Sequence, residues 1–148
     1  MRKYNERIEI EKRVIDRGWQ SHVKLIGFVN QSELPAYFAM SDIFVLPSSK
    51  EPFGLVINEA MSAGNAIIST DEVGATRDLI RHGENGYVCK AGDLNQMISV
   101  LRLALGNREH LNEMAIKSQR IIGEWSYKQD IEGILKALEG TTETRGDI

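Results

Sequence analysis

The sequence is poor in cysteine, in proline and in long apolar runs. Its 148 residues include one cysteine, Cys89, and three prolines. No internal disulfide can form, and Cys89, which follows Gly-Tyr-Val, is interpreted as a small buried hydrophobe in a strand. No apolar run approaches the ~18 residues that span a bilayer, and no signal-peptide core follows the charged N-terminus. The expected location is the cytoplasm, with a peripheral position at the inner face of the membrane as an alternative.

The sequence also lacks a large net charge of either sign and a set of histidines spaced as metal ligands. Lys+Arg number 18 against 21 Asp+Glu, for a net charge of -3, and the basic residues are scattered. Nucleic acid is therefore excluded as the main partner, because its phosphates require clustered cations. The three histidines show no ligand spacing, so no zinc site is predicted. The remaining composition, 42% hydrophobic and 26% charged, is that of one ordinary globular domain with its own core.

Short apolar runs alternate with helical patterns along the chain. Strands are predicted at residues 23–29, 43–46, 66–70 and 87–89. Helices are predicted at residues 3–17, 32–40, 54–63, around 79–80, 93–105, 108–122 and 127–138. This alternation predicts an α/β fold, a Rossmann-like parallel sheet with helices on both faces. Residues 1–139 are expected to form the domain and residues 140–148 a polar tail.

The loop that follows the strand 43–46 is the first place to look for a ligand, because such folds bind ligands beyond the carboxyl ends of their strands. Pro52 and Gly54 permit a tight entry into the next helix. The free N–H groups of Gly54, Leu55 and Val56 would point out of that helix, at the positive end of its dipole. The pattern predicts an anion site suited to a phosphate.

Two carboxylates flank the turn from Pro52 to Gly54 into the next helix, which we call the corner. Glu51 precedes the helix, and Glu59 lies five residues beyond Gly54, about 7.5 Å along the axis at 1.5 Å per residue. A carboxylate accepts hydrogen bonds from neighbouring hydroxyls, so the pair suits a nucleotide sugar, which carries hydroxyls at both ends and a diphosphate between them. The spacing alone leaves another interpretation open, in which Glu51 is a solvated loop acid and Glu59 a helix-surface residue.

The run from Ile43 to Gly64, followed by residues 66–75 and 78–88, resembles the group 1 (family 4) retaining glycosyltransferases. The resemblance extends from Val23 to the closing helices and implies the C-terminal, donor-binding half of a GT-B fold. It further implies transfer of a hexose from a nucleotide diphosphate sugar to a glycan or lipid-linked acceptor in polysaccharide biosynthesis, without a metal ion or other cofactor. Glu51 and Glu59 match the E-x7-E motif of that family.

The resemblance also implies roles for single residues. Glu51 would be the catalytic acid that faces the donor sugar, and Glu59 would hold the ribose. Lys50 is a candidate for the diphosphate, and Arg77 a weaker one, against the alternative that both are solvated. The residues predicted to bind the donor are Lys50, Phe53, Gly54, Leu55, Val56 and Glu59, and the resemblance implies that Phe28 and Val29 meet the base.

The sequence departs from the family pattern in three ways. The usual Gly-Gly loop reads Gly74-Ala75, and Asn65 stands where a proline is usual. The N-terminal acceptor domain and the first two donor-domain strands are expected to be missing; by family topology these strands lie between residues 23–29 and 43–46. Each buried unpaired backbone group costs about 1–3 kcal/mol. The chain is therefore predicted to repack, to associate with itself or another chain, or to be marginally stable.

Two alternatives to a transferase domain stay open from the sequence. The chain is either a non-catalytic nucleotide-sugar-binding module, including one subunit of a split transferase, or a truncated product without activity. The base, the sugar and the acceptor are not readable from these residues.

Overall fold

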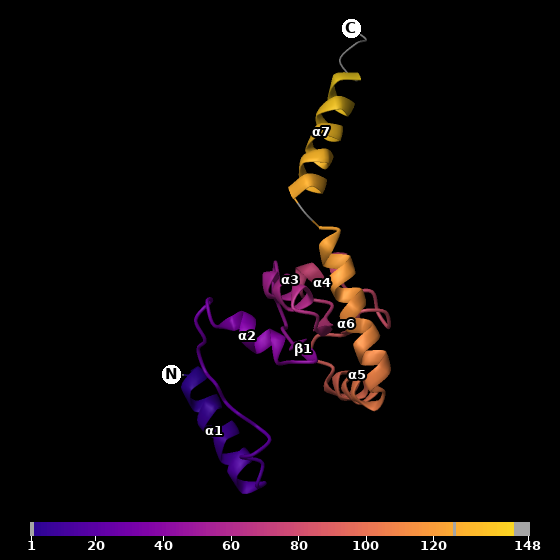
Figure 1. Cartoon of the computed structure of the whole chain (residues 1–148). Coiled ribbons are helices and arrows are strands. Elements are labelled where there is room, and N and C mark those ends of the chain that lie inside the picture. Colours follow the sequence, from indigo (N-terminus) through magenta and orange to yellow (C-terminus); the bar gives the residue numbers. More distant parts are fainter. Residues whose placement is uncertain (1, 126, 144–148) are drawn as a thin grey trace. The chain divides into compact units, whose positions relative to one another are not determined.

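The computed structural model describes residues 2–125 and 127–143 (Figure 1). The chain divides after Leu34 into two compact units, which are described separately. The larger unit contains all three strands and the helices that pack on them. Among the described residues, no helix combines the length and the apolar character that crossing a bilayer requires.

The N-terminal unit confirms one predicted element and contradicts another. Helix α1 spans Arg2–Asp16, as its alternating charges predict. The predicted strand at residues 23–29 is wrong, since this segment forms no ladder and Phe28 is 91% exposed. An extended apolar segment becomes a strand only when a neighbouring strand pairs with its backbone groups. Here the Leu25 carbonyl instead accepts a hydrogen bond from the Arg7 guanidinium at 3.1 Å.

The second unit is built on a parallel sheet. Strands β1 (Ile43–Leu46), β2 (Ala66–Thr70) and β3 (Gly86–Cys89) lie in the order β1-β2-β3. Both neighbouring pairs are parallel, with Ile43 opposite Ala66 and Ile68 opposite Tyr87. The first two strands coincide with the predicted runs, because a short continuous apolar segment is typical of a strand covered on both faces. The predicted α/β fold class is confirmed.

In the described part of the chain, six helices follow α1. They are α2 (Leu34–Ala39), α3 (Leu55–Ser62), α4 (Gly74–Leu79), α5 (Leu94–Gly106), α6 (Arg108–Gly123) and α7 (Tyr127–Glu143). Asp93 caps α5 as predicted, since its carboxylate accepts a hydrogen bond from the Gln96 amide at 2.9 Å. Helix α7 extends into the predicted tail of residues 140–148, of which 144–148 lie outside the described residues.

Helices cover both faces of the sheet, as predicted. On one face, Ala66 and Ile68 pack against apolar side chains of α5 and α6. On the other face, the ring of Phe38 in α2 packs edge-on against Phe44, with 5.6 Å between the ring centroids. Burial on both sides places β2 at the centre of the core, where all five of its residues are buried.

Two buried residues, Cys89 and Asn65, bear on predictions made from the sequence. Cys89 is 2% exposed, which confirms it as a buried core residue; burial raises the pKa of its thiol, and the negative charges of Asp71 and Asp93 raise it further. Asn65 is fully buried, and its amide nitrogen donates to the backbone carbonyls of Phe38, at 3.0 Å, and of Ser41. Asn65 thereby fastens the end of α2 to the start of β2, which a proline at this position cannot do.

Strand β1 has one open edge among the described strands. It pairs with β2 alone, and its four apolar residues are only half-buried. Edge strands in natural proteins are usually covered, or protected by a charge, a proline or a bulge. None of these devices interrupts Ile43–Leu46. Within the described residues, this edge is therefore an apolar surface that pairs with no second strand.

Candidate functional site

Two loops join each other at the carboxyl edge of the sheet, where β1 and β2 end. The Glu51 amide donates to the Glu72 carbonyl at 3.0 Å, and the Gly74 amide donates to the Glu51 carbonyl at 2.9 Å. The Ala75 amide adds a third hydrogen bond, to the Phe53 carbonyl at 2.9 Å. Both backbone groups of Glu51 are thus held by hydrogen bonds between the two loops.

Glycine is required where these loops approach each other. A Cβ atom at position 74 would lie 2.1 Å from the Pro52 carbonyl oxygen, which is a backbone atom. Gly54 has φ 75°, a left-handed conformation that side chains disfavour, and a Cβ there would lie 2.6 Å from Val73 Cγ1. Position 74 therefore requires glycine, because any side chain there would collide with the Pro52 carbonyl. The neighbouring position accommodates alanine, Ala75.

The Glu51 carboxylate bonds to amides that precede α3. Its Oε1 atom accepts hydrogen bonds from the amides of Phe53 and Gly54, each at 3.2 Å. The prediction that the Gly54 amide is free is therefore wrong. The physical reason is that an ionised carboxylate next to a helix start satisfies donors that would otherwise lack partners. This hydrogen bonding holds the loop in its tight conformation.

The amides of Leu55 and Val56 remain as the open donors of this corner. Helix α3 begins at Leu55, so neither residue has an acceptor four positions back within the helix. In the described part of the chain, neither amide donates to a side chain or to a carbonyl outside α3. Leu55 is 70% exposed. Glu59, also exposed, lies one helical turn further on the same face.

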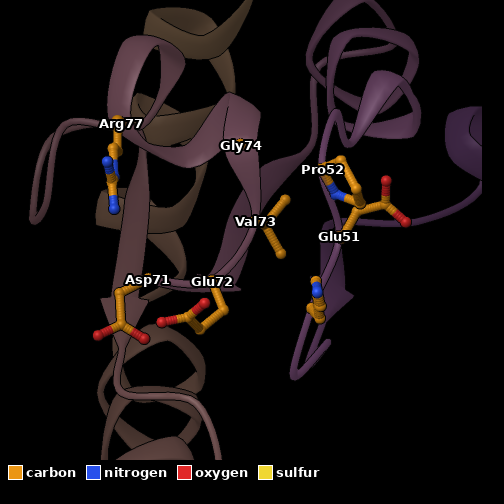
Figure 2. Close-up of a pocket in the computed structure, with 8 residues that line it drawn as sticks. Glu51, Pro52, Asp71, Glu72, Val73, Gly74 and Arg77 are labelled. Atoms are coloured by element: carbon orange, nitrogen blue, oxygen red, sulfur yellow. The ribbon is translucent and has the colours of Figure 1, made fainter.

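A cavity of about 350 Å³ lies beside the paired loops (Figure 2). Its lining residues are Lys50, Glu51, Pro52, Asp71, Glu72, Val73, Gly74 and Arg77. Figure 2 shows the Glu51 carboxylate directed away from Asp71 and Arg77. Asp71 is held in place, because its Oδ1 atom accepts a hydrogen bond from the Ala91 amide at 2.9 Å. Charges of both signs line the cavity, which suits a ligand rich in hydroxyl groups.

The structure brings some of the predicted site residues together and separates others. Lys50 and Glu51 share the cavity, and the Phe53 and Gly54 amides lie against Glu51. Glu59 lies on α3 and does not line the cavity. Phe28 and Val29, predicted to meet the base, belong to the N-terminal unit.

Sequence reasoning missed two residues of the cavity, Asp71 and Glu72. A signal for them was present, because they directly follow β2 at the same edge of the sheet as Glu51. A second cavity of about 160 Å³ opens at the same edge between Pro47, Thr70 and the start of α5. Within residues 2–125 and 127–143, no cluster of three or more His, Cys, Asp or Glu could hold a metal ion.

A parallel sheet with paired loops at its carboxyl edge places this chain among the open α/β folds, a class whose ligands are generally bound at that edge. The sequence model of the family "Glycosyl transferases group 1" matches residues 3–121, and the chain belongs to this family. A curated relative, the N-acetyl-alpha-D-glucosaminyl L-malate synthase of Bacillus anthracis, is 43% identical over 86 residues, which are 58% of this chain and 19% of the relative.

Solved structures show the same fold. The C-terminal domain of a group 1 glycosyl transferase from Francisella tularensis superposes with a TM-score of 0.75 at 28% identity, over 83% of this chain and 63% of that one. HepE from Anabaena, crystallised with UDP, gives a TM-score of 0.76 at 24% identity, over 93% of this chain and 38% of that one. The fold is therefore that of GT-B glycosyltransferases. The chain covers only part of its curated relatives. It spans 31% of the length of an uncharacterized glycosyltransferase of Haemophilus influenzae and 19% of the length of the Bacillus anthracis synthase.

Proposed function

We propose that this chain is the donor-binding domain of a retaining glycosyltransferase that takes a hexose from a nucleotide diphosphate sugar. The observation that carries the proposal is the corner at the start of α3, where two open amides lie next to a loop held by Glu51. HepE, which shares the fold, binds UDP and has also been crystallised with UDP-glucose. These complexes support a nucleotide sugar as the ligand of this site.

In the proposed complex, the diphosphate lies against the amides of Leu55 and Val56, at the positive end of the α3 dipole. Lys50 adds a positive charge, and Phe53 and Gly54 shape the corner that receives the sugar. These groups stabilise the negative charge that develops on the leaving nucleoside diphosphate, which is electrostatic catalysis. The proposal carries over the sequence-based expectation that no metal ion takes part.

The two acids hold opposite ends of the donor in this proposal. Glu59 accepts hydrogen bonds from the ribose hydroxyls. Glu51 uses Oε1 to hold the loop and leaves Oε2 to accept a hydroxyl of the donor sugar. One residue, Glu51, thus connects the conformation of the loop with the orientation of the sugar.

The test is a titration of the full chain with UDP and UDP-glucose, with GDP and ADP to identify the base. Glu59→Ala is expected to weaken UDP binding roughly 10- to 100-fold, because it removes hydrogen bonds to a charged acceptor worth about 1.5–3 kcal/mol. Glu51→Gln keeps an oxygen for the Phe53 and Gly54 amides. It is expected to spare UDP and to reduce the preference for UDP-glucose over UDP.

Glu109→Ala, which removes an exposed glutamate of α6, is the matched control and is expected to leave both affinities unchanged. Equal losses of UDP affinity in the Glu51 and Glu59 variants would contradict the assigned roles. Binding of none of the three nucleotides by the unmodified chain would refute the proposed function itself.

The acceptor is proposed to be a glycan or a lipid-linked saccharide in polysaccharide biosynthesis, bound by a further, N-terminal domain. Transfer is assigned to that complete assembly, in the cytoplasm or at the inner face of the membrane. A second candidate, a nucleotide-sugar-binding module or a subunit of a split transferase, is favoured by the open edge of β1. Adding a separately expressed N-terminal domain and measuring hexose transfer distinguishes a transferase part from a module that only binds.

The open edge of β1 leads to a prediction about association. We propose that a strand from another polypeptide, or from a second copy of this chain, covers Ile43–Leu46. The chain alone is expected to sediment as a species larger than a monomer, with a midpoint of thermal unfolding that rises with protein concentration. A dilute monomer that unfolds in one sharp calorimetric peak, independent of concentration, would contradict this prediction.

A further inference from the structure

Polar side chains occupy the last two positions of the central strand, β2. Ser69 is fully buried and Thr70 is 2% exposed, while the three residues before them are apolar. Thr76 in α4 is also 2% exposed. Buried hydroxyl groups are costly unless they are hydrogen-bonded, so their partners show what these residues hold together.

The hydroxyls form a relay from α4 through β2 to the end of β1. Thr76 Oγ1 donates to Ser69 Oγ at 3.0 Å, and Ser69 Oγ donates to the Leu46 carbonyl at 3.4 Å. Beside this relay, Thr70 Oγ1 donates to the Ser48 carbonyl at 2.5 Å. Leu46 ends β1, and Ser48 belongs to the loop that leads to Glu51. The relay therefore joins the two chain segments that form the candidate site.

Helix α4 depends on such contacts for its position. It has only six residues, and its N-cap residue, Val73, makes no side-chain capping hydrogen bond. The amides of its first two residues, Gly74 and Ala75, donate to the carbonyls of Glu51 and Phe53 in the neighbouring loop. The next residue, Thr76, attaches the same helix to the sheet. A shift of α4 on the sheet would move both amides away from the Glu51 loop.

We propose that Thr76 is a positioning residue for the donor site. Its hydroxyl fixes α4 against β2, so that Gly74 and Ala75 hold the backbone of the Glu51 loop and, through it, the start of α3. Thr76 itself contacts no ligand in this proposal. The ligand-binding part rests on the proposed function, whereas the ordering of the loop does not.

The test compares three variants of the full chain. Thr76→Val keeps the shape of the side chain and removes the hydroxyl, whereas Thr76→Ser keeps the hydroxyl. Ser118→Ala is the matched control, because Ser118 is a fully buried serine of α6 whose hydroxyl donates to the Asn85 carbonyl at 3.3 Å and not to a residue of β1, β2 or the Glu51 loop. The readouts are amide hydrogen exchange at Gly74 and Ala75, and the affinity for UDP.

Thr76→Val is expected to accelerate exchange at Gly74 and Ala75 about fivefold, the effect of losing one hydrogen bond, and to weaken UDP binding by a similar factor. Thr76→Ser is expected to restore both values, and Ser118→Ala to leave both unchanged. If Thr76→Val prevents folding, Ser69→Ala, which removes the acceptor of the Thr76 hydroxyl, is expected to give the same acceleration.

Unchanged exchange at both amides in the variant that folds would overturn the proposal. An acceleration that serine at position 76 fails to rescue, or that the Ser118 variant shares, would overturn it too. If the unmodified chain binds no nucleotide, the proposed function fails, while the exchange comparison still decides the role of Thr76.

Discussion

Replacing Gly74 with alanine is expected to abolish measurable UDP binding and to lower the free energy of unfolding by about 3 kcal/mol. The added Cβ would lie 2.1 Å from the Pro52 carbonyl oxygen. This backbone cannot yield locally, because the Glu51 amide and carbonyl on the adjacent residue are both hydrogen-bonded across the two loops. The loops must separate, and the hydrogen bond from the Gly74 amide to Glu51 is lost with them. Urea unfolding and titration calorimetry measure the two effects.

Two other glycines provide the controls for this variant. Gly86→Ala also meets a carbonyl, that of Ile67 at 2.0 Å, but within the sheet, at the start of β3. It is expected to destabilise the chain as strongly without a selective effect on the Glu51 loop. Gly106→Ala meets no atom within 4 Å and is expected to leave stability and binding nearly unchanged. Full UDP binding by the Gly74 variant would contradict the coupling of the loops.

Gly54→Ala is expected to lower the free energy of unfolding by about 3 kcal/mol as well, through two separable costs. A residue with a side chain at φ 75° costs about 1–2 kcal/mol, and the Cβ would overlap with Val73 Cγ1 at 2.6 Å. The double variant Gly54→Ala with Val73→Ala removes the overlapping atom. Its stability is expected to exceed the value obtained by adding the two single effects.

The control for the backbone cost is Gly83→Ala, where φ is 82° and a Cβ would meet nothing within 4 Å. This variant is expected to lose only the 1–2 kcal/mol of the left-handed conformation. A double-mutant cycle in chemical denaturation measures the coupling between positions 54 and 73. Strict additivity in that cycle would contradict the proposed overlap.

The sequence predicted the sheet of the second unit well, because the signals for its strands are local. Ile43–Leu46 and the first three residues of Ala66–Thr70 are short apolar runs between helices, a pattern typical of the strands of a covered parallel sheet. The same type of signal failed at residues 23–29. A strand there requires a partner strand, and the segment itself carries no information on whether that partner is present.

The sequence predicted where the candidate site lies, at the turn between β1 and α3, but it did not predict the hydrogen bonds within the site. The strand, the glycine and the helix that follow one another around Glu51 indicate a place where a ligand binds. Whether the Glu51 carboxylate points outward or bonds to the Phe53 and Gly54 amides depends on a side-chain rotamer. The relay from Thr76 to Ser69 joins residues of two elements, and it becomes visible only when α4 is placed on β2.

The most direct test of the central claim is to follow the backbone amide resonances of the full chain while UDP is added. The largest changes in chemical shift are expected at Leu55 and Val56, the open donors at the start of α3. The second cavity, lined by Pro47, Asp93 and Leu94, provides an internal comparison, and its amides are expected to move little. Changes centred on Asp93 and Leu94, with Leu55 and Val56 unmoved, would show that UDP binds elsewhere and would refute a site at the start of α3.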